Sequence, residues 1–174
     1  MTSYTGQKDT GQKDKLATDS NKQKALELGF HRVGIATIAP EPSAAEKNAT
    51  NVLQQWLEQG FQADMGWMES VRRQDVRQIM PEAQSMICVA LNYYTPHERP
   101  VGDDYAKISR YGWGRDYHRI LSKKLKRFAL WLRSHNNTLA KPYADTGPVQ
   151  DKFWAQQAGL GWNAKNGNVI TRDY

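Results

Sequence analysis

A near-continuous apolar run in the middle of the chain places the strongest constraint on its fold. The run MICVAL lies within residues 82–94, with Pro81 before it and Pro96 after it. A strand that is apolar on both faces must be covered on both sides, as in a sheet flanked by other layers. The run therefore predicts a buried core strand.

Further strands and helices alternate with this run. Residues 30–39 are rich in β-branched side chains and end before Pro40, which predicts another strand. Helical spacing of apolar residues predicts a helix over 44–59, closed by Gly60, and a long amphipathic helix over 117–136. The order predicts an α/β (α+β) fold with a mixed sheet flanked by helices.

Weaker signals fill in the remainder. Ser20 is a candidate N-cap for a short helix that ends at Gly29. The prolines and glycines of 95–116 predict a long loop. A turn over 145–148, a helix over 149–158 and a short NVIT strand complete the chain.

The N-terminal segment differs in composition from the rest. It reads TGQKD twice in tandem and offers no apolar side chain to bury between Thr5 and Asp14. We expect a disordered polar tail over 1–16 and one domain over 17–174, a length that can bury a single core.

Charge and cysteine content limit the classes of function. The formal net charge of +6 favours a polyanionic partner such as nucleic acid without identifying it. The single cysteine, Cys88, excludes an internal disulfide, fits a reducing cytosolic setting and is expected to be a small buried apolar residue. We find no signal peptide and no run long enough to span a bilayer, and expect no membrane partner. The basic residues of the 117–136 helix form either an ordinary solvated face or an RNA-facing one: Lys123, Lys124, Lys126, Arg127 and Arg133.

The segment ISRYGWGRDYH, residues 108–118, crowds arginines, aromatic rings and two glycines together. Glycines let a backbone approach a ligand, arginines meet phosphate or carboxylate, and aromatic rings stack. A loop whose aromatics fill a core edge explains the same composition equally well.

Asp145 precedes a Thr-Gly-Pro turn. An aspartate at this place often caps the turn by accepting backbone N–H bonds. The alternative is a general acid, which requires a carboxyl group kept protonated near neutral pH.

The segment AGLGWNAKNGN, residues 158–168, joins glycines to Lys165 and Asn166, which can bond a ligand's polar groups. A structural turn explains the spacing as well. The chain lacks both the P-loop and the dinucleotide-binding glycine patterns, and its histidines lack zinc-site spacing, so we expect no metal site.

Five segments in this order resemble the N-terminal half of epoxyqueuosine reductases: LGF…VGIA, WMESVRRQDVRQIMPEAQSMICVALNYY, ISRYGWGRDYH, DTGP and AGLGWNAKN. The resemblance runs from about Lys22 to the last residue. It implies a cobalamin-binding domain similar to that of the reductive dehalogenases. It also implies an oxidoreductase that reduces the epoxide of epoxyqueuosine, at the wobble position of tRNA, to queuosine.

The resemblance also assigns roles to matching positions. It implies that Asp145 is the proton donor to the epoxide oxygen and lies at the cofactor. It implies that Arg73, Ser109 and Val169 contact cobalamin, and that Lys165 and Asn166 shape its pocket.

The chain departs from the family pattern in one respect. The family's cysteine-rich segment, which binds two [4Fe–4S] clusters, is absent, so the clusters expected in a full-length protein have no ligands here. We therefore expect an incomplete cobalamin-binding catalytic domain, inactive alone, from a monomeric cytoplasmic enzyme that binds the tRNA anticodon stem-loop. The alternative is a non-catalytic basic module that binds RNA or cobalamin.

Overall fold

The computed structural model describes residues 8–172, with side chains described from Lys15 onward. The chain forms two compact units, each built from two stretches of sequence. Unit 1 joins the stretch up to His31 to Ala90–Ala144, and unit 2 joins Arg32–Val89 to the stretch from Asp145 onward. Each unit is described by itself.

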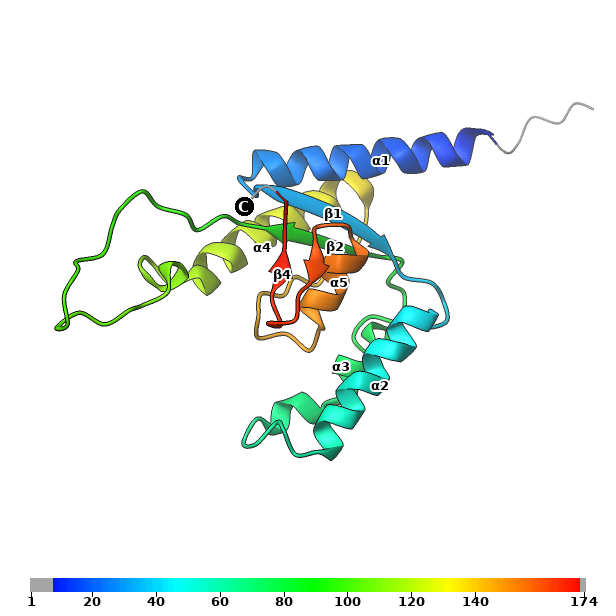
Figure 1. Cartoon of the computed structure of the whole chain (residues 1–174). Helices are drawn as coiled ribbons and strands as arrows, with labels where there is room; N and C mark the ends of the chain where they lie inside the picture. Colours follow the sequence, from blue (N-terminus) through cyan, green and yellow to red (C-terminus); the bar gives the residue numbers. More distant parts are fainter. Residues whose placement is uncertain (1–7, 173–174) are drawn as a thin grey trace, which may run out of the picture. The chain divides into compact units, whose positions relative to one another are not determined.

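Two long helices form the core of unit 1. Helix α1 spans Lys8–Glu27 and helix α4 spans Tyr117–Asn136, and the two pack against each other (Figure 1). Among the residues of this unit whose side chains are described, four apolar ones are buried: Ala25, Phe30, Phe128 and Leu132. The amphipathic helix predicted over 117–136 is confirmed, because its buried residues lie one helical turn apart.

The ends of α4 follow from its flanking residues. The carboxylate of Asp116 accepts a hydrogen bond from the backbone N–H of His118, which satisfies a donor of the first turn. Asn137 ends the helix with φ +49, a left-handed conformation that asparagine tolerates.

One lysine of α4 points toward α1 instead of outward. Lys124 Nζ donates hydrogen bonds to the carbonyl oxygens of Leu28 at 2.6 Å and Gly29 at 3.2 Å. The last carbonyls of a helix lack partners within it and carry partial negative charge, which an ammonium group satisfies. The expectation that Lys124 belongs to the outer basic face is therefore wrong. The other basic residues of that face are exposed, as expected: Lys123, Lys126, Arg127 and Arg133.

The beginning of α1 also differs from the expectation. The helix starts at Lys8, so the predicted tail over 1–16 overlaps it, and Ser20 lies inside the helix instead of capping it. A helix whose C-terminal end is packed extends at little cost through residues that lack proline, because each added residue adds one hydrogen bond. Residues 1–7 of the predicted tail lie outside the described residues.

Unit 2 contains two small sheets in place of the expected mixed sheet. Strand β1, Arg32–Thr37, lies beside β2, Ser85–Ala90. Strand β3, Trp162–Asn163, pairs antiparallel with β4, Val169–Ile170. The NVIT segment thus forms a hairpin with the residues just before it and does not join the strand of the MICVAL run. The mixture of strands and helices is confirmed, and the single mixed sheet is not.

The register of β1 and β2 follows from the hydrogen bonds at their ends. The N–H of Ile38 donates to the carbonyl of Gln84, and the N–H of His31 donates to that of Ala90. As residue numbers rise along β1, the numbers of their partners in β2 fall, so the two strands run antiparallel.

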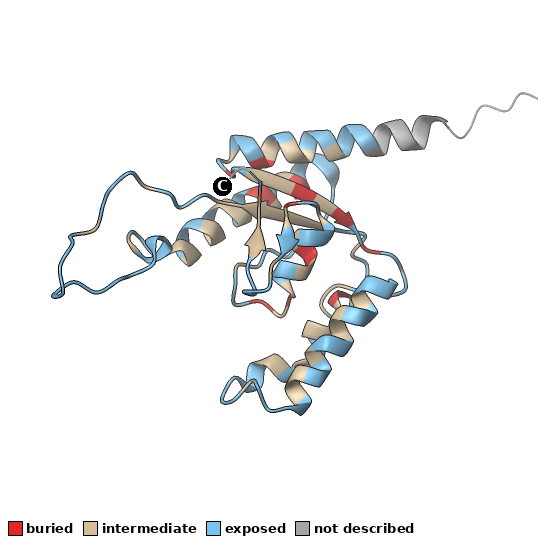
Figure 2. Ribbon diagram, viewed as in Figure 1, coloured by how far each residue is buried: buried red, intermediate tan, exposed pale blue. Residues whose placement is uncertain are grey.

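Helix α5, Asp151–Gln157, covers β1 and completes the core of unit 2. Figure 2 shows the buried residues on these elements. Gly34 on β1 lies against Ala158, and a Cβ at Gly34 would overlap the carbonyl oxygen of Ala158. The core cluster consists of Ala36, Ile38, Val76, Val149 and Trp154.

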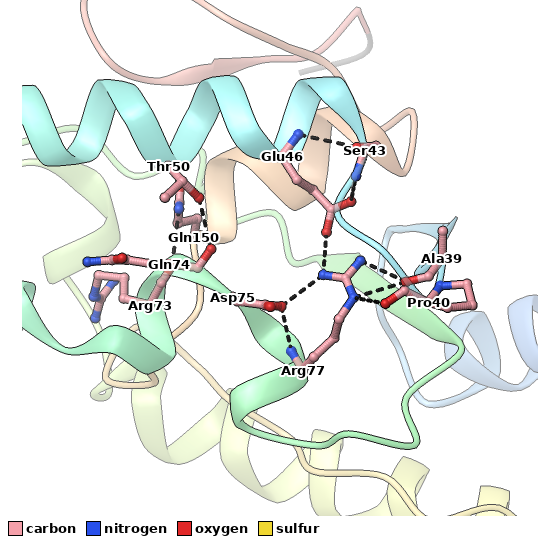
Figure 3. A network of polar contacts seen from close by, with 10 residues as sticks. All are labelled: Ala39, Pro40, Ser43, Glu46, Thr50, Arg73, Gln74, Asp75, Arg77 and Gln150. Carbon is pink, nitrogen blue, oxygen red and sulfur yellow. Dashed lines mark hydrogen bonds and ion pairs between the residues drawn. The ribbon is translucent and has the colours of Figure 1, made fainter.

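A polar network joins helix α2, Ala44–Glu58, to the segment that follows it (Figure 3). Ser43 and Glu46 form a reciprocal capping box at the start of α2. Arg77 Nη1 donates to the carboxylates of Glu46 at 3.0 Å and Asp75 at 2.8 Å. Its Nη2 donates to the carbonyl of Ala39 at 2.7 Å. The guanidinium therefore ties α2 to the end of the β1 strand segment.

Short helices carry the chain from α2 to β2. They are η1, Gly66–Glu69, α3, Val71–Gln74, and η2, Val76–Gln78. Thr50 Oγ1 on α2 donates to the carbonyl of Gln74 at 2.9 Å, which fixes the end of α3. Helix α3 is therefore held against α2 within unit 2.

Candidate proton-donor and cofactor site

Asp145 lies on an exposed turn with a left-handed backbone. Its φ is +63, and it is exposed, whereas Gly147 and Val149 just after it are buried. A residue other than glycine is uncommon in this region, although aspartate and asparagine are tolerated better than most. Backbone conformations of this kind cost of order 1–3 kcal/mol and gather at functional sites. The exposed Asp145 thus lies at the start of a turn that leads into the buried Gly147 and Val149.

Arg73, on α3, is bound to the residues that follow Asp145. Its Nη2 donates to the carbonyl of Gly147 at 2.9 Å and its Nη1 to that of Val149 at 3.2 Å. In return, Gln150 Nε2 donates to the carbonyl of Arg73 at 3.1 Å (Figure 3). The guanidinium also lies 4.9 Å from the ring centroid of Trp67, and its Nε is buried without a hydrogen-bond partner. The Nε–H of this arginine is therefore without a hydrogen-bond partner among the described residues.

A second carboxyl group, Asp151, lies close enough to this site to respond to its charges. Asp151 has exposed surface, yet its carboxyl lies among enough protein atoms that desolvation raises its pKa. The negative charge of Asp145 raises the pKa of Asp151 further, while Arg73 lowers it in part. The site therefore combines two interacting carboxyl groups with one arginine.

Cys88 on β2 is not a reactive thiol. Burial, with a smaller contribution from the charge of Asp151, raises the pKa of Cys88 to about 12. A thiol with so high a pKa is protonated at neutral pH and is a poor nucleophile. The expectation of a small apolar core residue fits this environment.

The predicted cofactor residues near the C-terminus lie on and beside one hairpin. Lys165 and Asn166 are exposed in the turn between β3 and β4, and Val169 is half-buried on β4. Asn166 Oδ1 accepts a hydrogen bond from the N–H of Asn168 at 3.1 Å, and Gly167 has φ +74. The turn therefore uses the side-chain oxygen of Asn166, and both Lys165 and Asn166 are exposed.

Ser109 lies in unit 1, at the start of the short helix η3, Arg110–Gly112, and makes no capping bond with its side chain. The guanidinium of Arg110 lies 5.0 Å from the ring centroid of Tyr94 and 5.5 Å from that of Trp113. Tyr94 and Tyr111 are 67% and 55% exposed, so these rings do not fill a core. The segment is an exposed cluster of stacked arginine and aromatic side chains.

The structure thus brings Arg73 next to the Asp145 turn and places Lys165, Asn166 and Val169 on a separate hairpin of the same unit. Ser109 belongs to unit 1. Sequence reasoning missed Gln150 and Asp151. Both follow the DTGP motif within three residues, and the start of a predicted helix just after a functional turn was the available signal.

Two classes of feature are missing from the part of the chain that the structure describes. Across residues 8–172, no three His, Cys, Asp or Glu side chains gather in a way that would hold a metal ion. Within the same range, every helix is too short or too polar to cross a membrane.

Comparisons with known proteins connect this site to one family. Residues 73–146 match the sequence family described as "Epoxyqueuosine reductase QueG, DUF1730". The match begins at Arg73 and includes Ser109 and Asp145.

Curated relatives agree with this match. An epoxyqueuosine reductase of Atelocyanobacterium thalassa is 51% identical over 159 residues, which are 90% of this chain and 50% of the relative. One of Synechocystis sp. is 52% identical over 138 residues, which are 79% of this chain and 48% of the relative. The chain spans about half the length of the curated relatives it matches. The resemblance of the five segments to this family is confirmed.

The fold has a matching crystal structure. A structure of epoxyqueuosine reductase with an epoxyqueuosine-modified tRNA-Tyr stem loop superposes with a TM-score of 0.75. The match covers 92% of this chain and 42% of that one at 23% identity. At this identity the likeness shows a shared fold.

Proposed function

We propose that this chain is part of an epoxyqueuosine reductase, an oxidoreductase that converts epoxyqueuosine at the wobble position of tRNA to queuosine. One observation carries the proposal: half of the sequence is identical to a curated epoxyqueuosine reductase over nine-tenths of the chain. Because the chain spans half of such relatives, the complete reaction belongs to a longer protein.

Asp145 is proposed as the proton donor. Removing the epoxide oxygen consumes two electrons and two protons and releases water. As a C–O bond of the epoxide breaks, negative charge develops on the oxygen, and the O–H of a protonated Asp145 transfers its proton there. The exposed turn supports this role because a substrate can reach Asp145, and the bound substrate and cofactor would supply the burial that keeps its carboxyl group protonated.

Cobalamin is proposed as the cofactor on the family resemblance, and the residues are of a kind that fits it. Cobalamin is large and amphipathic, with peripheral amides that need hydrogen-bond donors and acceptors. The buried, unpartnered Nε of Arg73 and the exposed Lys165 and Asn166 offer donors, and Val169 offers an apolar surface. Ser109 is proposed from the resemblance, with its hydroxyl not used for capping.

When bound, cobalamin would supply the low-potential reducing chemistry, and the residues of this chain would bind, orient and protonate. The single cysteine cannot supply four thiolates for an iron–sulfur cluster. The [4Fe–4S] clusters are therefore proposed to belong to the half of the relatives that this chain does not cover. The assignment of 17–174 to one cobalamin-binding domain stays a prediction.

The partner is proposed to be tRNA, through its anticodon stem-loop, and the crystal structure with an epoxyqueuosine-modified tRNA stem loop supports a tRNA partner. The exposed Lys123, Lys126 and Arg127 of α4 would neutralise phosphates. A tRNA-modifying role is consistent with a monomeric enzyme of the cytoplasm.

The proposal is tested with the complete protein that contains this chain, epoxyqueuosine-containing tRNA and a low-potential reductant. Digestion of the tRNA and mass spectrometry of its nucleosides should show queuosine, one oxygen atom lighter than the substrate. Tight binding of tRNA or cobalamin with no conversion would favour a non-catalytic binding module.

A further inference from the structure

The residues after Asp145 are held by a reciprocal pair of side chain to backbone contacts. Two N–H groups of the Arg73 guanidinium bind the carbonyls of Gly147 and Val149, and the side-chain amide of Gln150 binds the carbonyl of Arg73. We call these three hydrogen bonds the Arg73–Gln150 clamp. They connect segments more than 70 residues apart in sequence.

The planar guanidinium suits this contact. Its two Nη groups point in a fixed fork, so two carbonyls of one turn can be bound together and their spacing is fixed by the arginine. A lysine ammonium is a single flexible point charge and cannot impose that spacing. The clamp therefore constrains the shape of the turn as well as its position.

Both ends of the clamp are anchored. Val149 is 6% exposed and belongs to the core cluster with Trp154, while the carbonyl of Gln74, next to Arg73, binds Thr50 on α2. Asp145 itself is exposed with φ +63 and lies two residues before the first clamped carbonyl. The exposed left-handed residue is thus connected to the core through the clamped residues.

We infer that Arg73 and Gln150 are positioning residues that hold the Asp145 turn in the geometry needed for proton transfer. This inference rests on the proposed function of Asp145. It differs from a cofactor contact of Arg73, because two nitrogens of the guanidinium are already used by the turn and only its Nε is left without a partner among the described residues. Gln150 would influence proton transfer only by holding the Asp145 turn in place.

The test uses the complete protein with two variants, Gln150→Met, which keeps the size but removes the donor, and Arg73→Lys, which keeps the charge but removes the fork. Hydrogen–deuterium exchange is followed in peptides covering 143–150 and in peptides covering β1 and α5. Gln157→Met and Arg72→Lys are matched controls, since both residues are exposed.

We expect exchange over 143–150 to become about fivefold to tenfold faster in each variant, the effect of losing one or two modest hydrogen bonds, while β1 and α5 keep their rates. We expect kcat for epoxide reduction to fall by about tenfold to a hundredfold, the effect of a misplaced reacting group. The KM for tRNA, and for Gln150→Met the visible spectrum of bound cobalamin, should stay unchanged.

Unchanged exchange over 143–150 in both variants would overturn the inference, as would faster exchange spread equally over β1 and α5. Faster exchange over 143–150 together with an unchanged kcat would also overturn the inference. If the unaltered protein does not reduce epoxyqueuosine, the proposed function fails. The exchange measurement then still decides whether Arg73 and Gln150 hold the turn.

Discussion

Lys124 Nζ lies 2.6 Å from the carbonyl oxygen of Leu28, so the middle of α4 is hydrogen-bonded to the C-terminal end of α1. The contact adds to the backbone cap of α1, in which the N–H of Gly29 donates to the carbonyl of Leu26 and that of Phe30 donates to the carbonyl of Ala25. Gly29 is explained by that cap, because its φ of +81 is a left-handed conformation that glycine adopts without strain. The two helices of unit 1 are thus joined by a polar contact as well as by apolar packing.

Removing this ammonium should destabilise unit 1. We expect Lys124→Met to lower the free energy of unfolding by about 1–2 kcal/mol, because hydrogen bonds from a charged donor are worth more than neutral ones and this donor is partly exposed. Denaturant unfolding followed by circular dichroism measures the change. Lys123→Met, at the exposed neighbouring position, should change stability by less than about 0.5 kcal/mol. Equal effects of the two substitutions would contradict the capping role.

The Arg77 network predicts a pH dependence of stability. Burial opposes ionisation of Glu46, but its hydrogen bonds with Arg77 and Ser43 outweigh burial and hold the pKa of Glu46 below its ordinary value of 4.5. A carboxyl whose pKa is depressed in the folded state stabilises the fold above its unfolded pKa, and this contribution is lost as the pH falls through the folded pKa. Glu46→Gln should therefore destabilise the protein at pH 7 and have less effect as the pH falls below about 4.5. Unfolding titrations at several pH values, with the exposed Glu58→Gln as control, measure the difference.

Asp151 should behave in the opposite way. Desolvation and the charge of Asp145 raise the pKa of Asp151 in the folded state, so its ionised form is disfavoured there. A raised pKa favours the fold at low pH, and this advantage is lost as the pH rises through the folded pKa. Asp151→Asn should therefore raise the free energy of unfolding at pH 7 and have less effect at pH values below the ordinary aspartate pKa. A loss of stability at pH 7 would show that the helix-start position of Asp151 matters more than its desolvation.

Much of the fold could be predicted from local patterns, and the exceptions have physical causes. The β1 and β2 strands, α2 and α4 were predicted because apolar spacing and end signals agree at each of them. The expected burial of β2 on both faces was wrong, because Ser85 is exposed and the other residues of the strand are only half-buried. The start of α1 was not, because a helix extended from a packed end needs no apolar pattern of its own. Lys124 was misplaced because composition does not tell which lysine of a helix meets a neighbouring helix end.

The candidate site was predicted only in part, because local patterns single out individual residues but do not tell which distant residues they meet. Asp145 was singled out by a local motif, and its turn is where the motif indicated. The clamp depends on Arg73 meeting residues 147–150, a pairing across more than 70 residues that spacing along the chain does not contain. The roles given to Ser109, Lys165, Asn166 and Val169 stay predictions.

Binding of tRNA should depend steeply on salt. Each lysine or arginine that neutralises a phosphate releases a counterion, so the logarithm of affinity falls linearly with that of the salt concentration. Replacing Lys123 and Lys126 together by alanine should weaken binding and reduce the slope by about 1–2. Titrations of labelled anticodon stem-loop at several salt concentrations measure this. Binding by the unaltered protein that is insensitive to salt would exclude the α4 face as the footprint.

The role of Asp145 is best separated from simple turn capping by Asp145→Asn. Asparagine tolerates the φ of +63 and keeps one acceptor oxygen, so a residue that only shapes the turn should be replaced with little loss. An amide is a far poorer proton donor than a carboxylic acid, and loss of a general acid typically slows a reaction by about 10²–10⁴-fold. We therefore expect Asp145→Asn, in the complete protein, to bind cobalamin and tRNA normally and to lose turnover by that factor. Single-turnover conversion of epoxyqueuosine, measured by mass spectrometry of tRNA nucleosides, provides the readout, and unfolding curves confirm an intact fold. Near-normal conversion by this variant would make Asp145 a structural turn residue and remove the chemical basis of the proposed site.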